Sequence, residues 1–176
     1  TRVDFYQLPD KDLDASLRFA CRLCLKALGS NMPVHIRVDD QPQAQAVDDL
    51  MWDYPKHRLV PHAIIDGDAD PKAHDAARSN HPVHIGWQEP AHDTGLLINL
   101  GNDVPSFFGR FDRVAEIIVE ESKTLRREHY KFYRERGYPL HHHALEDGIN
   151  RPLRTIRVTM DNNFNPQAIE QSLYAH

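Results

Sequence analysis

The sequence is poor in the features that export, membrane insertion and cross-linking require. Only two of its 176 residues, Cys21 and Cys24, are cysteines, which excludes a disulfide framework. Its apolar runs are short, as in 95–100, whereas a bilayer-spanning helix needs about 20 apolar residues. No signal-peptide pattern of a cationic start, an apolar run and a small-residue cleavage site is present. These absences predict a protein of the reducing cytoplasm.

Glycine is missing where nucleotide chemistry needs it. A dinucleotide site needs glycines after the first strand, so that the backbone approaches a pyrophosphate at a helix N-terminus. The corresponding turn here, 7–12, has no glycine and contains the carboxylates of Asp10 and Asp12. No Gly-x-x-x-x-Gly-Lys-Ser/Thr motif occurs either. The sequence therefore disfavours phosphate binding.

No motif assigns catalytic groups or metal ligands. No serine or cysteine lies in a nucleophile-elbow context, and no two carboxylates suit acid and base roles. The two cysteines lie on the apolar face of a predicted helix, as buried small residues do. The histidine groups lack zinc-ligand spacing, whether His81, His84 and His92 or His141, His142 and His143. We expect no enzyme activity, no cofactor and no metal.

Length and charge limit the remaining functions. The chain is 40% hydrophobic and 27% charged, a composition and size that suit one domain with a tail. Its formal net charge is -5. Binding to nucleic acid over the whole surface is disfavoured, because that affinity comes from neutralising phosphates. Any basic function must therefore be local.

Strand-like and helical segments alternate along the chain. Strands are expected at 3–8, 33–38, 83–87, 96–100 and, as the last, 114–119, with an extended stretch at 59–62. Helices are expected at 11–28 (with Asp10 as N-cap), 43–52 and 123–138, a short turn at 104–108, and an exposed loop at 66–80. The alternation predicts an α/β fold of three layers, with helices on both faces of a mostly parallel sheet.

The segment 123–138 has the pattern of a helix with one basic side. Gly137 and Pro139 are typical of a helix end. At 3.6 residues per turn, the basic side comprises Lys123, Arg127, Tyr130, Lys131 and Arg134, and the side expected to be buried comprises Leu125, His129 and Phe132. The basic side suits an acidic ligand. A solvated helix end, stabilised by the macrodipole, is the alternative.

Eight short segments, in order and similarly spaced between about residues 2 and 140, resemble the chi subunit family of the bacterial DNA polymerase III holoenzyme. They are Val3-Asp4-Phe5-Tyr6, Val38-Asp39-Asp40, Gln45-Ala46, Leu50-Met51-Trp52, Val60-Pro61-His62, Ile85-Gly86-Trp87, Leu97-Ile98-Asn99-Leu100 and the stretch 127–134. The resemblance implies an α/β domain that is Rossmann-like in outline, without a nucleotide-binding loop. It also implies a non-catalytic adaptor of the clamp-loader assembly in DNA replication, which contacts DNA only indirectly.

The resemblance also implies two protein-binding sites. The first would hold the acidic C-terminal tail of single-stranded DNA-binding protein at Arg127, Tyr130, Lys131 and Arg134. The second, at Trp52 and Leu59, would bind the psi subunit or an XPD-like helicase. Leu59 stands where some relatives carry phenylalanine. The alternative function is a Rossmann-like enzyme that uses a small nucleotide or a methyl-donor cofactor.

The C-terminal part departs from this family. We predict a domain at 1–143 and a tail at 144–176, within which 160–174 resembles the N-terminus of valyl-tRNA synthetase. The hypothesis that follows is read-through from one coding region into the next. The chain begins with Thr1 instead of methionine, which suggests a trimmed N-terminus.

Overall fold

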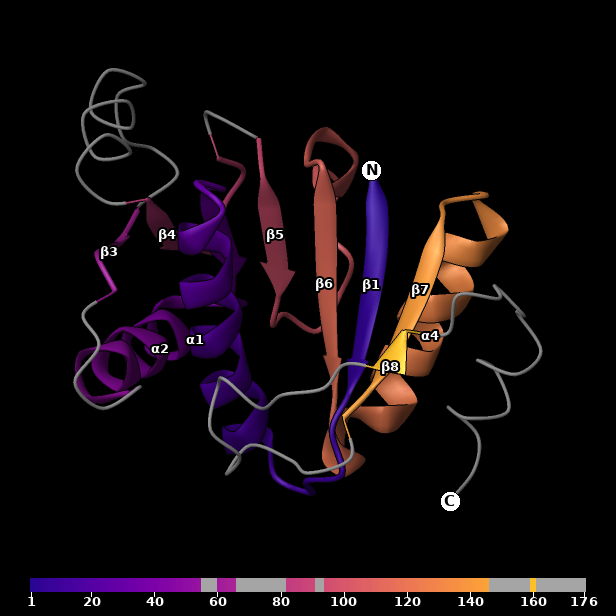
Figure 1. Cartoon of the computed structure of the whole chain (residues 1–176), viewed down its shortest axis with the longest axis horizontal. Helices are drawn as coiled ribbons and strands as arrows, with labels where there is room; N and C mark the ends of the chain where they lie inside the picture. Colours follow the sequence, from indigo (N-terminus) through magenta and orange to yellow (C-terminus); the bar gives the residue numbers. More distant parts are fainter. Residues whose placement is uncertain (55–59, 66–81, 91–93, 146–158, 161–176) are drawn as a thin grey trace.

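A single sheet forms the centre of the computed structural model, which describes residues 1–54, 60–65, 82–90, 94–145 and 159–160. Its strand order is β3-β4-β2-β5-β6-β1-β7-β8 (Figure 1). The strands are β1 (Arg2–Gln7), β2 (Val34–Arg37), β3 (His62–Ile64), β4 (Val83–Gly86), β5 (Leu96–Asn99), β6 (Arg113–Ile118), β7 (Leu140–Ala144) and β8 (Thr159–Met160). Pairing is parallel throughout except between β7 and β8. The predicted mostly parallel sheet is confirmed.

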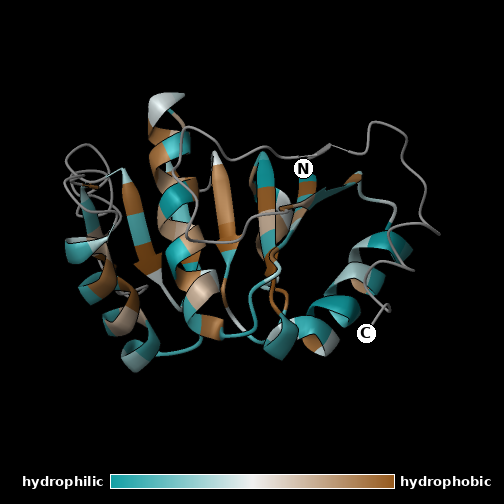
Figure 2. Ribbon diagram, turned by 60° about the horizontal axis from the view of Figure 1, so that its bottom comes forward, coloured by the Kyte–Doolittle hydropathy of each residue, from teal (hydrophilic) through white to brown (hydrophobic). Residues whose placement is uncertain are grey.

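Helices cover both faces of this sheet. α1 (Leu13–Gly29) and α2 (Gln41–Asp53) pack on one face, and α4 (Lys123–Glu135) packs on the other. The short 3₁₀ helices η1 (Phe108–Arg110) and η2 (Glu120–Ser122) flank β6. Figure 2 shows the most hydrophobic residues on the central strands, as expected for a parallel sheet buried on both faces. The three-layer α/β fold is therefore as predicted.

The ends of the helices follow from local hydrogen bonds. The carboxylate of Asp40 caps α2 by accepting from the backbone N–H of Gln43 at 2.9 Å. The N-cap of α1 is Asp12, so the prediction of Asp10 was wrong. The reason is that the backbone carbonyl of Asp10 accepts from the N–H of Glu120, which holds that residue beside the end of β6.

A glycine ends α4, as predicted. Gly137 has a φ of 77°, in the left-handed region. Its N–H donates to the carbonyl of Arg134 at 3.0 Å, and the N–H of Tyr138 donates to the carbonyl of Tyr133 at 3.2 Å. This pair of bonds is a Schellman motif, which closes the helix at Glu135.

The strand β7 was not predicted from the sequence, which placed the last strand at 114–119. β7 pairs with β1, and β8 pairs with β7 at residues 143–144. Three consecutive histidines, 141–143, conceal the strand pattern, although His143 is buried. The division into a domain and a tail stays a prediction. The predicted loop at 66–80 and most of 144–176 lie outside the described residues.

A buried carboxylate ties β1 to both of its neighbours. Asp4 is 1% exposed, and it pairs with Arg2 at 2.9 Å, Arg113 of β6 at 3.0 Å and His143 of β7 at 2.7 Å. Burial alone would raise the pKa of Asp4. The hydrogen bond to His143 and the charges of Arg113 and Arg2 outweigh burial and lower this pKa from 3.8 to about 2.

The pairing of Asp4 predicts a pH-dependent stability. Because its pKa is lower in the folded state, Asp4 contributes about 2 kcal/mol near neutral pH, of which roughly half is lost by pH 3. The free energy of unfolding, measured with urea at pH 6 and at pH 3, should fall less between these two pH values in Asp4→Asn than in wild type. The control is Asp14→Asn, which removes an exposed pair with Arg18 and should leave the wild-type pH dependence. Equal pH dependence in Asp4→Asn and wild type would contradict this role.

Candidate functional site

The inner side of α4 is held by a buried carboxylate from the sheet. Glu116 of β6 is fully buried. It accepts hydrogen bonds from Arg126 at 2.7 Å, Tyr133 at 2.9 Å and Asn99 at 3.0 Å, and His129 Nδ1 lies 3.0 Å from its Oε1. Burial would raise the pKa of Glu116, but the charge of Arg126 and the contacts with His129 lower it. The charged carboxylate therefore fixes how α4 lies on β6.

Because of this network, the side of α4 that faces the sheet is not the side that the sequence predicted. Lys123 and Tyr130, expected on the exposed basic side, are only 8% and 1% exposed. Arg126 and Tyr133, assigned to neither side, are buried because they bind Glu116. The side predicted to be buried is so only in part, with His129 buried and Leu125 and Phe132 half-buried. Apolar periodicity alone could not reveal a buried charge.

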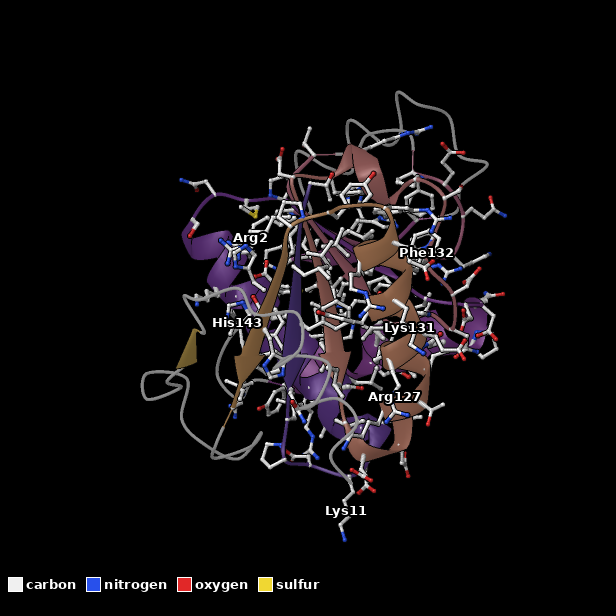
Figure 3. The ribbon with its side chains drawn as sticks, turned by 90° about the vertical axis from the view of Figure 1, so that its right-hand side faces the viewer. Arg2, Lys11, Arg127, Lys131, Phe132 and His143 are labelled. Carbon is white, nitrogen blue, oxygen red and sulfur yellow. The ribbon has the colours of Figure 1, made fainter. Side chains whose placement is uncertain are left out.

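Three of the predicted cations still share the outer flank of α4. Lys131 is exposed and Arg127 and Arg134 are half-buried, at spacings of four and three residues. Figure 3 shows Arg127 and Lys131 on α4, seen from the side of the molecule where β7 lies. The guanidinium of Arg134 lies 5.9 Å from the centre of the Tyr130 ring. The buried ring of Tyr130 therefore contacts Arg134 and is not exposed to a ligand.

The second predicted site centres on Trp52, near the end of α2. Its side chain is 63% exposed. The indole Nε1–H donates to Asp48 at 3.3 Å, and the indole ring lies 4.8 Å from the ring of His62 in β3. Leu59, its predicted companion, lies outside the described residues.

Two neighbours of Trp52 were missed by the sequence reasoning. Asp48 lies four residues before Trp52, so the helical spacing could have identified it as a contact. His62 reaches Trp52 from another element, and no local signal predicts that contact. The sequence thus locates the tryptophan but not the groups around it.

The carboxyl ends of the strands are the place where a Rossmann-like enzyme would bind its cofactor. A crevice of about 200 Å³ lies there, with Leu13, Leu17, Leu100 and Leu125 among its lining residues. At the N-terminus of α1, the backbone N–H of Leu13 donates to the carboxylate of Glu121 at 3.0 Å. A phosphate at this helix end would meet that negative charge. The arrangement disfavours the nucleotide alternative.

The described residues provide neither a grouped set of metal ligands nor a membrane-spanning helix. Within the described ranges, no three His, Cys, Asp or Glu side chains are grouped so as to hold a metal ion. His81 and His92 lie outside those ranges. In the same part of the chain, no helix has the length and apolar character needed to cross a bilayer.

Comparison with known proteins decides the family. The family model described as "DNA polymerase III chi subunit, HolC" matches residues 1–141. The chain belongs to this family. The chi family comprises accessory subunits of a replicative DNA polymerase and not catalytic ones, which agrees with the function class predicted from the sequence.

Three individual chi subunits illustrate the similarity. The DNA polymerase III subunit chi of Pseudomonas aeruginosa is 38% identical over 148 residues, which cover 82% of this chain and 97% of the relative. That of Escherichia coli K12 is 29% identical over 132 residues, or 73% and 84% of the two chains. That of Haemophilus influenzae is 26% identical over 142 residues, or 78% and 93%.

The network beneath α4 predicts a large effect of one substitution. Glu116→Ala leaves the Arg126 guanidinium buried without its counter-ion, and should lower the free energy of unfolding by about 3–5 kcal/mol. Tyr133→Phe removes one hydrogen bond to this charged carboxylate and should cost about 1.5–3 kcal/mol. Both values can be measured by urea unfolding followed by circular dichroism. Glu128→Ala, at an exposed position of α4, is the matched control. A loss in Glu116→Ala as small as in this control would disprove the assignment.

Proposed function

We propose that the chain is a non-catalytic adaptor that binds the acidic C-terminal tail of single-stranded DNA-binding protein on α4 and the psi subunit on α2. The observation that carries the proposal is the cation row of α4, defined as Arg127, Lys131 and Arg134, in a chain whose net charge is -5. The protein would thereby link that tail to the clamp loader in the cytoplasm and contact DNA only indirectly.

Electrostatics sets the expected strength of the first contact. One exposed ion pair contributes less than about 1 kcal/mol. Several cations on one flank, together with apolar contact to the terminal phenylalanine of the tail, can reach roughly 8 kcal/mol, or micromolar affinity. Because the Tyr130 ring is buried, we assign the phenylalanine contact to the aliphatic stems of the cation row. Tyr130 contributes by supporting Arg134.

The second contact is assigned to Trp52. Tryptophan is enriched among the residues that dominate binding energy, and this one is 63% exposed. Leu59 is retained as its proposed companion. An XPD-like helicase is the other partner that the family resemblance suggests for this surface.

The cation row predicts salt-sensitive binding of an acidic peptide. A fluorescent peptide that ends in Asp-Ile-Pro-Phe should bind the wild type with micromolar affinity, and binding should weaken as salt rises because exposed charges are screened. Arg127→Ala with Lys131→Ala should weaken it at least about tenfold. Fluorescence anisotropy at two salt concentrations measures both effects.

The control removes the same two types of cation from the other face of the sheet. Arg18→Ala with Lys26→Ala, both in α1, should leave the peptide affinity within about twofold of wild type. An equal loss in both double variants would mean general attraction without a site on α4. No binding to the folded wild type would overturn the α4 assignment.

A further inference from the structure

Trp52 combines high exposure with a held side chain. Only Leu13 and Trp52 are exposed among the large apolar residues of the described ranges. The indole N–H of Trp52 is bonded to Asp48, and its ring lies against His62. A side chain held in place before binding loses little conformational entropy when a partner covers it. An exposed, pre-positioned tryptophan is therefore well suited to anchor an interface.

One carboxylate joins the groups that hold this indole. Asp48 Oδ2 accepts from Trp52 Nε1 at 3.3 Å, and Asp48 Oδ1 lies 3.1 Å from His62 Nε2. The His62 side chain is fully buried, and its Nδ1 lies 2.6 Å from the carbonyl oxygen of Val60. His62 is thus fixed to the backbone, and the carboxylate of Asp48 lies close to its ring and accepts a hydrogen bond from the indole. Asp48 is a positioning residue for Trp52.

The described part of α2 around Trp52 is acidic, while Lys56 and Arg58, which follow α2 in the sequence, lie outside the described residues. Asp49 and Asp53 are exposed on the same helix, and no lysine or arginine occurs in α2 from Gln41 to Asp53. The cation row lies on α4, across the sheet from α2 (Figure 1). The two helices therefore present charges of opposite sign on opposite faces of the molecule. An acidic rim around an apolar anchor favours a basic partner and disfavours the acidic ligand proposed for α4.

We propose that Asp48, Asp49, Trp52 and Asp53, here called the Trp52 face, form a docking surface for a basic protein segment. This segment supplies an apolar pocket for the indole, and its lysines or arginines pair with Asp49 and Asp53. The inference rests on the proposed function, because it specifies the chemistry of the partner that binds α2. It adds Asp48 and His62 as the residues that hold the anchor.

The charge part of this inference can be tested with the full chain and the psi subunit of the same organism as the probe. Trp52→Ala should weaken binding at least about thirtyfold, as for a central interface tryptophan. Asp49→Lys with Asp53→Lys should weaken it about tenfold or more, mainly through slower association, and should abolish its decrease with salt. The matched control is Glu128→Lys with Glu135→Lys on α4, which changes net charge equally and should leave the affinity within about twofold.

The positioning part needs a readout from the indole itself. The chain has two tryptophans, so Trp87→Phe leaves Trp52 as the only one, which can be excited selectively at a wavelength that tyrosine does not absorb. In that background, Asp48→Ala should increase the fast component of the time-resolved anisotropy and accelerate psi dissociation about fivefold. Asp48→Asn retains an oxygen acceptor for the indole N–H and should restore part of both effects.

The outcomes separate this inference from the function on which it rests. Failure of psi to bind the wild type overturns both. Binding that needs Trp52 but is unaffected by charge reversal at Asp49 and Asp53 overturns the basic partner and supports the proposed function. Unchanged anisotropy in Asp48→Ala overturns the positioning role. Weakening by the α4 control equal to that by the α2 pair also overturns the proposal, because it would show attraction by net charge alone.

Discussion

Glu116 carries a negative charge into the middle of the sheet, and the elements around it neutralise that charge. Arg126 and His129 reach it from α4, and Asn99 reaches it from β5. Separating a buried ion from its partner costs several kcal/mol, so α4 cannot turn about its axis without a large loss of stability. This constraint determines which side of α4 meets solvent. The cation row lies at the surface because Arg126, and not Arg127, binds the carboxylate.

Local patterns predicted most strands, because a strand buried on both faces is largely apolar, as the three residues 96–98 of β5 are. They failed where a charged or polar residue is paired across a long sequence separation. Arg126 turns inward toward Glu116 of β6. In β7, His143 is bonded to Asp4, 139 residues away. Neither contact can be recognised from neighbouring residues alone. For this reason the sequence predicted neither the buried side of α4 nor the strand β7.

The two candidate surfaces differ in how far the sequence could locate them. The cation row is a local feature, since its spacings of four and three residues place it on one flank of any helix. The exposure of Trp52 is not local, because tryptophan occurs in cores and interfaces alike. Only the packing of α2 against β3 and β4 shows that Met51 is fully buried and Trp52 is not. Resemblance to a family supplied what periodicity could not.

A Rossmann-like sheet commonly uses its carboxyl edge for an anionic ligand, and here Glu121 already occupies the N-terminus of α1. In the proposed function, the partners bind not at that edge but on the outer sides of α2 and α4, which lie on opposite faces of one sheet. Two partners on opposite faces do not compete for space. Because the buried network of Glu116 holds α4 in one orientation, the cation row is in place before a partner binds. If neither partner alters the state that the other binds, the two affinities are independent, because two ligands are coupled only through such a change of state. An adaptor of this kind joins its partners by geometry and not by allostery.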